Sequence, residues 1–266
     1  MGVLNVTPDS FSDGGTLFSD GTLAIPRVLD RAAGMVADGA AILDIGGEST
    51  RPGATPVGIQ EELDRVVPCV EALSGEFDVV LSIDTSSPEV MRAAAASGAG
   101  MINDVRALQR EGALAVAAEL RLPVCLMHMR GTPASMQSQP RYDDVLTEVK
   151  DFLLARAQAC EAAGLGVDLI TLDPGIGFGK SVEHNLALLR GLPSLVETGY
   201  PVLVGLSRKS LIGKLLGREV DERLPASLAL AVLAAERGAR IIRSHDVRAT
   251  VDALAMVSAL VGEEES

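Results

Sequence analysis

Residues 172–181 combine a carboxylate, three glycines and a lysine within ten positions. Two phosphate-binding motifs are close to this pattern, and both fail on spacing. A P-loop needs four residues between its first glycine and Gly-Lys-Ser, but that first position is Pro174, and Gly175 leaves only three. The dinucleotide fingerprint needs a glycine where Lys180 stands. We therefore interpret the stretch as a buried strand that ends in Asp173, beside a turn of bare glycine backbone.

Three polar side chains, Asp84, Asn103 and Asp173, directly follow short aliphatic runs. Each of them alone is more often a structural cap than a ligand group. Buried carboxylates are costly without donors, so three such residues on neighbouring strands indicate an acceptor-rich cavity for a flat heterocycle with N–H donors. A carboxylate binds a guanidine-like edge through two parallel hydrogen bonds, and Lys209 is a nearby cationic counterpart.

A second polar group lies near the end of the chain, at Arg243, Ser244 and His245. Arg51, on an early loop, can face the same place. Guanidinium donors with a histidine suit an anion, and the last strands of a barrel commonly hold phosphate. For His245, a packed or capping role is the alternative.

Asn5, Asp9 and Asp13 offer hard oxygen atoms near the start of the chain. Such oxygens suit Mg²⁺ that is shared with substrate phosphates. Turn formation is the alternative for each loop aspartate, so Asn5 is the first candidate ligand and Asp13 the second. Zinc is not expected, because the three histidines are dozens of residues apart and no cysteine cluster accompanies them.

Short aliphatic runs alternate with helical patterns along the chain. The runs carry little polar alternation, which is typical of parallel strands covered by helices. We expect strands at residues 1–6, 40–46, 79–84, 101–105, 124–128, 169–172, 202–206 and 240–243. We expect helices at 24–38, 59–73, 88–97, 112–120 and 246–261, with further helices up to residues 163 and 235.

This alternation predicts an α/β fold, a (β/α)8 TIM barrel with its active site at the C-terminal mouth of the strands. A doubly wound open sheet is the alternative. Polar groups follow nearly every strand at the same end; a barrel brings them to one mouth, whereas an open sheet spreads them along an edge of roughly 35 Å, at ~4.8 Å per strand. We expect one domain at residues 1–262 and a solvated acidic tail at 263–266.

Composition limits the possible function classes. The formal net charge is −13, and 47% of the residues are hydrophobic. Such an acidic chain is not expected to bind nucleic acid or an anionic membrane, although a local cluster of Arg and Lys can bind a small anion. No apolar run approaches the ~18 residues of a membrane span. The cysteines are far apart, as expected for reduced thiols in the cytoplasm.

Eight motifs in order along nearly the whole chain resemble those of the bacterial dihydropteroate synthase family. No single motif would suffice, but the ordered set is highly specific. The motifs stand at residues 5–15, 47–53, 82–85, 102–105, 126–129, 172–180, 207–210 and 243–247.

The resemblance implies a TIM barrel that joins p-aminobenzoate to (7,8-dihydropterin-6-yl)methyl diphosphate and releases diphosphate, with Mg²⁺ as cofactor. By position, Asp84, Asn103, Asp173 and Lys209 would hold the pterin, and Met127 and Gly205 would lie along its faces. Asn5 would bind Mg²⁺, and Arg51, Arg243, Ser244 and His245 would bind the diphosphate. Phe11, Thr50, Pro52, Phe178, Ser207 and Arg208 would surround p-aminobenzoate.

The expected mechanism is a dissociative substitution. Mg²⁺ and the Arg/His group would stabilise the leaving diphosphate, while Asp84 and Asp173 would stabilise the pterin cation, with Lys209 beside them. The weakly basic arylamine would attack after, or as, the bond breaks. The resemblance also implies competition by sulfonamides and a homodimer through the late helices. Lys180 has no assigned role at this stage.

Two alternatives remain at the level of sequence. A pterin-binding methyltransferase domain would keep the pterin acids but would not need the diphosphate group, and a non-catalytic pterin binder would keep both. Family members also usually carry a short hairpin ahead of the first strand, whereas Met1 here stands at that strand. We expect this departure to bear on stability rather than on chemistry.

Overall fold

The computed structural model of the chain describes residues 1–7, 17–19, 22–49, 57–131 and 140–261. Eight parallel strands form the inner layer of these residues. They are β1 (Gly2–Asn5), β4 (Ile42–Gly46), β5 (Val80–Asp84), β6 (Met101–Asp104), β7 (Val124–Met127), β8 (Ile170–Asp173), β9 (Leu203–Gly205) and β10 (Ile241–Arg243). One short antiparallel hairpin, β2 (Phe18–Ser19) and β3 (Thr22–Leu23), was not predicted.

The strands follow one another round a ring in chain order. A continuous ladder runs from β1 through β4 to β8, and β9 pairs with β10. Single parallel bridges join the two parts, between Leu172 and Val202 on one side and between Gly2 and Ser244 on the other. Main-chain hydrogen bonds accompany both bridges, including Val3 N–H to Ser244 O at 3.1 Å. This closed order is that of a (β/α)8 barrel, and the predicted fold class is confirmed.

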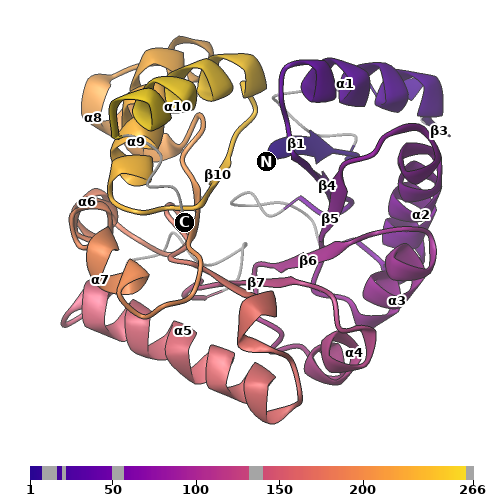
Figure 1. Ribbon diagram of the computed structural model, residues 1–266, viewed down its shortest axis with the longest axis horizontal. Coiled ribbons are helices and arrows are strands. Elements are labelled where there is room, and N and C mark those ends of the chain that lie inside the picture. Colours follow the sequence, from indigo (N-terminus) through magenta and orange to yellow (C-terminus); the bar gives the residue numbers. More distant parts are fainter. Residues whose placement is uncertain (8–16, 20–21, 50–56, 132–139, 262–266) are drawn as a thin grey trace.

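Helices form the outer layer and surround the strands (Figure 1). Proline stands in the first turn of α1, α3, α7 and α9, where its missing N–H has no intrahelical partner in any case. The helices are α1 (Ile25–Ala37), α2 (Ile59–Glu76), α3 (Pro88–Ala96), α4 (Ala113–Leu120), α5 (Val145–Ala162), α6 (Val182–Arg190), α7 (Leu192–Val196), α8 (Ser210–Leu216), α9 (Leu224–Glu236) and α10 (Val247–Val261).

Side chains alternate between the two faces of each strand, as the two-residue period requires. Leu43 and Ile45 of β4 point outward into a core that they share with α1, α2 and α3. Asp44, between them, points into the barrel. Deep in the interior, Met101, Cys125 and Leu203 form a small apolar layer. The polar side chains nearer the mouth of the barrel therefore pack on an apolar layer.

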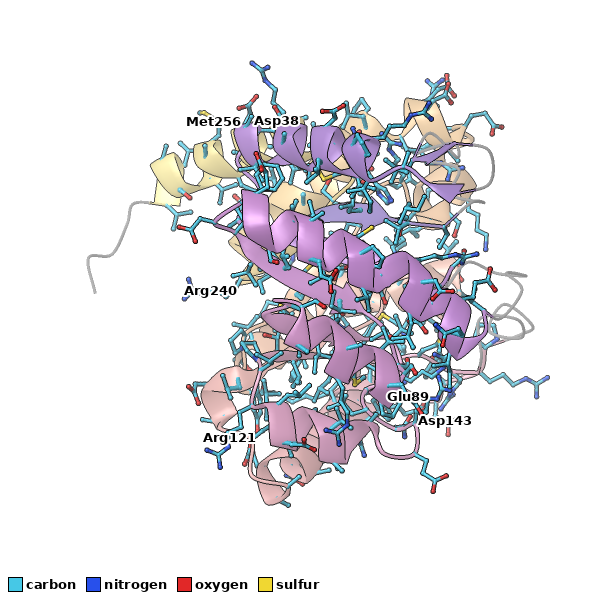
Figure 2. The ribbon with its side chains drawn as sticks, turned by 90° about the vertical axis from the view of Figure 1, so that its right-hand side faces the viewer. Asp38, Glu89, Arg121, Asp143, Arg240 and Met256 are labelled. Atoms are coloured by element: carbon cyan, nitrogen blue, oxygen red, sulfur yellow. The ribbon has the colours of Figure 1, made fainter. Side chains whose placement is uncertain are left out.

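The eight parallel strands point toward the same end of the molecule, which carries the mouth of the barrel. Glu89 and Asp143, near the starts of α3 and α5, lie toward this end in Figure 2, and Arg121 and Arg240, which precede β7 and β10, lie toward the other. No helix among the described residues is both long and apolar enough to span a membrane. The predicted acidic tail lies outside the described residues.

Candidate active site at the mouth of the barrel

The strands bring seven of the predicted site residues to inward positions. Asn5 pairs in register with Gly46, which pairs with Asp84, which in turn pairs with Asn103. Residues paired in this way share one face of the sheet. The same register joins Met127 to Asp173 and Gly205 to Arg243. The predicted convergence of strand ends on one mouth is confirmed by this register.

Arg243 lies across the barrel interior between two carboxylates. Its Nε donates to Asp44 Oδ2 at 2.6 Å, and its Nη2 donates to Asp84 Oδ2 at 3.1 Å. Asp44 is fully buried and also accepts from Ser82 Oγ at 2.6 Å and from Asn103 Nδ2 at 3.1 Å. Because Asp44 takes the amide N–H of Asn103, the amide oxygen of Asn103 is directed away from it. One network thus orients side chains from four strands.

The two acids at the mouth have raised pKa values. Burial, followed by the charge of Asp44, raises the pKa of Asp84 to about 7, while Arg243 acts in the opposite direction. Burial also raises the pKa of Asp173, although the Gly175 N–H, which donates to Asp173 Oδ1 at 2.7 Å, acts in the opposite direction. A ligand that donates N–H groups to these carboxylates would favour their ionised forms.

Lys209 and Phe178 face each other from the loops after β9 and β8. Lys209 Nζ lies 4.3 Å from the centre of the Phe178 ring, within the range of a cation–π contact. Burial lowers the pKa of Lys209 to about 8, and the charge of Asp173 raises it in part. A half-buried cation therefore lies against Phe178, a predicted wall of the p-aminobenzoate site, and interacts with the charge of Asp173, a predicted pterin ligand.

His245 lies beside Ser207 at the end of the last strand. Its Nδ1 is 3.1 Å from Ser207 Oγ, and its N–H donates to the same oxygen at 3.2 Å. Burial, together with the charges of Arg243 and Arg208, lowers the pKa of His245 to about 3. Asp246 pairs with Arg208, whose Nε donates to it at 3.0 Å, instead of orienting the imidazole, so the three residue types do not form a nucleophilic triad. A neutral imidazole would meet an anion as a hydrogen-bond donor.

Ser244 differs from Arg243 and His245, its neighbours in the predicted diphosphate-binding site. Its hydroxyl accepts from Asp246 N–H at 3.1 Å and from Thr250 Oγ at 2.9 Å. Its main chain carries the bridge that joins β10 to β1. The structure thus places Ser244 in the barrel wall and at the start of α10, whereas Arg243 faces the interior.

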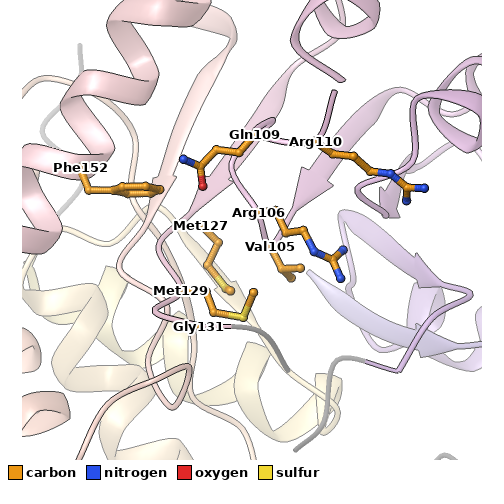
Figure 3. Close-up of a pocket in the computed structure, with 8 residues that line it drawn as sticks. All are labelled: Val105, Arg106, Gln109, Arg110, Met127, Met129, Gly131 and Phe152. Carbon is orange, nitrogen blue, oxygen red and sulfur yellow. The ribbon is translucent and has the colours of Figure 1, made fainter. Parts of the chain in front are cut away.

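A pocket of about 440 Å³ opens beside Met127 (Figure 3). The loop after β6 forms one wall of it, and the guanidinium groups of Arg106 and Arg110 lie on this side. Asp104 holds the loop by accepting from the N–H groups of Arg106 and Leu108 at 2.8 and 2.7 Å. Because Met127 also belongs to the predicted pterin site, the pocket is an extension of the barrel mouth.

Asn5 and Asp84 provide two side-chain oxygens of the kind that bind Mg²⁺. A Cβ atom on Gly46 would lie 3.4 Å from Asn5 Oδ1 and 3.9 Å from Asp84 Oδ2, so both oxygens border one space above this glycine. The described residues contain no group of three or more His, Cys, Asp or Glu side chains suited to a metal ion. Mg²⁺ often takes one or two protein oxygens and completes its shell with phosphate and water, which this donor set permits.

Six predicted residues lie outside the described residues, and their roles stay predictions. They are Asp9, Phe11, Asp13, Thr50, Arg51 and Pro52.

Sequence reasoning gave Lys180 no role and counted Asp44 only among the polar residues at the strand ends. Asp44 interrupts the aliphatic run of β4 at an inward position, and Ser82 does the same in β5. A polar residue at an inward-facing position of an aliphatic strand is a signal that could have identified both Asp44 and Ser82. Lys180 is only 2% exposed, and nothing in its glycine-rich surroundings in the sequence indicates burial.

Acids and cations lie together inside the C-terminal mouth of a (β/α)8 barrel, which is where enzymes of this fold have their active sites. The model of the pterin binding enzyme family matches residues 1–245, and the chain belongs to this family.

Named relatives match over nearly the full length. The dihydropteroate synthase of Escherichia coli (strain K12) is 52% identical over 266 residues, covering 100% of this chain and 93% of the relative. A solved structure of the Yersinia pestis dihydropteroate synthase with a sulfonamide drug has a TM-score of 0.94 and 51% identity, covering 98% of this chain and 93% of the other. The Xanthomonas albilineans dihydropteroate synthase in complex with 7,8-dihydropteroate has a TM-score of 0.87 and 49% identity, with the same coverage.

Proposed function

We propose that the chain is a dihydropteroate synthase: a transferase that condenses (7,8-dihydropterin-6-yl)methyl diphosphate with p-aminobenzoate to 7,8-dihydropteroate and diphosphate, in folate biosynthesis. The observation that carries the proposal is the joining of Asp84, Asn103 and Arg243 in one buried network at the barrel mouth. Relatives of this name at 52% identity over the whole chain support it.

The pterin ring is assigned to the interior acids. Asp173 would accept from the guanidine-like edge of the ring through two hydrogen bonds, and Asp84 and Asn103 would bind its other polar atoms. Met127 and Gly205 would lie along its faces, since both occupy inward positions on β7 and β9. Lys209 would provide the single cationic donor near the ring.

The diphosphate is assigned to the side of the mouth where β10 ends. Arg243 and His245 would donate to it, together with Arg51, and Asn5 would hold Mg²⁺, with Asp13 as a second candidate ligand. When bound, Mg²⁺ neutralises part of the phosphate charge and so favours departure of the leaving group. Because Arg243 pairs with Asp84, binding of the diphosphate to Arg243 would weaken this ion pair.

The chemical step requires stabilisation of charge rather than a covalent intermediate. As the diphosphate leaves, the carboxylates of Asp84 and Asp173 stabilise the cation on the pterin, and the arylamine attacks its methylene carbon. Phe178, Ser207 and Arg208 would orient p-aminobenzoate, with Phe11, Thr50 and Pro52 completing its site. Closure of the site around both substrates would exclude water, which otherwise captures the cation.

An assay of diphosphate release that omits each substrate in turn tests the proposal. Release and formation of 7,8-dihydropteroate should require both substrates and Mg²⁺. Binding of the pterin substrate without product would favour a non-catalytic binder, and methyl transfer would favour a pterin-binding methyltransferase domain. Asp84→Asn should lower turnover more than pterin affinity, with exposed Asp30→Asn as the matched control.

The remaining proposals concern inhibitors, assembly and location. We expect sulfonamides to compete with p-aminobenzoate; insensitivity at saturating drug would contradict this. A homodimer through α9 and α10 would cover exposed apolar side chains such as Leu233, Met256 and Leu260. Light scattering of Met256→Glu, which should be monomeric if the wild type is dimeric, tests this surface.

The chain is further proposed to be one domain over residues 1–262, and to be cytoplasmic. The described cysteines are free and buried, as is usual in a reducing compartment. Cell fractionation tests the location, and a single unfolding transition supports the one-domain assignment.

A further inference from the structure

Lys180 is buried between the loops that follow β7 and β8, with 2% of its surface exposed. Its Nζ lies 3.2 Å from His128 O, 3.0 Å from Gly175 O, 3.0 Å from Phe178 O and 2.9 Å from His128 Nδ1. We propose that Lys180 is a positioning residue for both substrates, whose ammonium group fixes these two loops and thereby places Asp173 and Phe178. The inference rests on the proposed function.

The Lys180 Nζ lies among main-chain carbonyls; burial lowers the pKa of Lys180 to about 7, and the charge of Asp173 acts in the opposite direction. Burial of a charged group is costly unless hydrogen bonds replace its water. Three carbonyl oxygens and one imidazole nitrogen surround Nζ, so the number of acceptors exceeds the three N–H donors of the ammonium group. Because a protonated lysine only donates, His128 Nδ1 is the acceptor, and the ring carries its proton on Nε2. Burial, with the charge of Lys180 as the next cause, lowers the pKa of His128 to about 3, in agreement with a neutral ring.

The two loops meet backbone to backbone, which explains the glycines. Gly175 has φ +66°, and a Cβ atom there would lie 1.9 Å from His128 O. Gly179 has φ +64°, and its Cβ would lie 2.3 Å from Arg130 O. Such close approach leaves no room for side chains at these positions. A single lysine reaching between the loops is therefore well suited to fix their separation.

The same contacts lead directly to the predicted ligand groups. Asp173 accepts at its carboxylate from Gly175 N–H at 2.7 Å and at its main-chain oxygen from His128 N–H at 3.0 Å. Phe178 donates its N–H to Gly175 O at 3.1 Å, and its ring faces Lys209. The ammonium group of Lys180 thus contacts His128 and Gly175, the two residues that donate to Asp173, and also the main chain of Phe178.

Direct binding of phosphate by Lys180 does not fit this geometry. The side chain is buried among carbonyl oxygens, which would repel a phosphate group. Its charge instead reaches Asp173, since Lys180 is among the groups that lower the pKa of that carboxyl against the larger effect of burial. A role in positioning therefore fits the contacts better than a role in contacting substrate.

The test compares Lys180→Met, which keeps the length and apolar stem, with Lys214→Met, which removes an exposed lysine on α8. KM for each substrate, kcat and melting temperature are measured for both variants. We expect KM for p-aminobenzoate and for the pterin diphosphate each to rise about tenfold in Lys180→Met, with a smaller change in kcat and a parallel rise in the sulfonamide inhibition constant, since misplacement of about 1 Å has effects of this order. Lys214→Met should behave as wild type.

A lower melting temperature of Lys180→Met with both KM values unchanged would overturn the inference, because it would indicate a merely structural role. Should Lys180→Met not fold, His128→Phe removes the Nδ1 acceptor and retains the edge contact with Phe152, whose ring centre lies 5.0 Å away. This variant should raise both KM values about threefold, since it removes one of four contacts, and unchanged KM values would again overturn the inference. A wild type that forms no 7,8-dihydropteroate would instead refute the proposed function.

Discussion

Replacing Asp44 by asparagine tests the buried network directly, because the change removes a charge and keeps the shape. Asp44 Oδ2 accepts from both Asn103 and Arg243, and Oδ1 accepts from Ser82 Oγ at 2.6 Å. An asparagine oxygen in the Oδ2 position keeps the first two hydrogen bonds. Its amide N–H would then donate to the Ser82 hydroxyl, which can rotate and accept.

The magnitude follows from the remaining contacts. Removing one partner of a buried ion pair costs ~3–5 kcal/mol when the other charge is left alone. At pH 8 Asp84 is ionised, so Arg243 keeps this partner at 3.1 Å, and the repulsion between Asp44 and Asp84 disappears. We therefore expect Asp44→Asn to lower the free energy of unfolding by only ~1–2 kcal/mol at pH 8 and by ~3–5 kcal/mol at pH 5.5, where Asp84 is protonated and Arg243 keeps no ionised hydrogen-bond partner.

The loss of stability should depend on pH. Because the pKa of Asp84 is about 7 in the folded protein and ordinarily 3.8, ionising Asp84 destabilises the folded protein progressively as pH rises through this interval, by roughly 4 kcal/mol in full. Asp44 is the second cause of this shift, after burial, so Asp44→Asn should lower the pKa of Asp84. The variant should therefore be closer to wild type at pH 8 than at pH 5.5.

Urea unfolding at both pH values, with exposed Asp30→Asn as the control, measures this difference. The acidic limb of kcat/KM for the pterin substrate should move to lower pH in the same variant. A stability loss that is equal at both pH values, or larger at pH 8, would refute the assignment of Asp44 as a cause of the raised pKa of Asp84.

Two further predictions follow from the mouth of the barrel. For the wild type, kcat/KM for the pterin substrate should rise with pH through about 7 as Asp84 ionises and fall above about 8 as Lys209 loses its proton; a falling limb that persists in Lys209→Met would contradict the second assignment. Gly175→Ala should weaken binding of the pterin substrate about tenfold or more, measured by calorimetry, because its Cβ would overlap His128 O. Gly75→Ala, whose Cβ would meet nothing within 4 Å, should bind as wild type, and equal affinities in both variants would exclude the steric argument.

The sequence predicted the fold well because the signal for it is local. Aliphatic runs and helical spacing lie within short windows, and observed strands such as β5 and β6 begin and end within one residue of the predicted ranges. Asp173 and Asp84 were also predictable, since a carboxylate directly after an aliphatic run marks a strand end in the sequence itself.

The pairing inside the barrel was not predictable in the same way. Arg243 contacts Asp44 across 199 residues of sequence, and only the closed ring brings the two together. The role of Lys180 depends on the backbone approach of two loops, which requires the turn geometry of three glycines with positive φ. Such contacts depend on tertiary geometry, which residue spacing does not encode.

The ring of strands is closed by few hydrogen bonds at β9 and β10, which affects where the barrel opens locally. β9 and β10 have three residues each, and single bridges join them to the remaining strands, whereas β4 and β5 share five registered pairs. Elements with few connections have low local opening free energies. We expect amide hydrogens of β9 and β10 to exchange with deuterium before those of β4 to β7. Arg243 ends β10 and Lys209 lies in the loop that follows β9, whereas Asp84 and Asp173 lie on the continuous ladder. A pterin substrate that binds Lys209 and Arg243 as well as Asp84 and Asp173 would connect β9 and β10 to the continuous ladder. Its binding should therefore slow amide exchange most in β9 and β10.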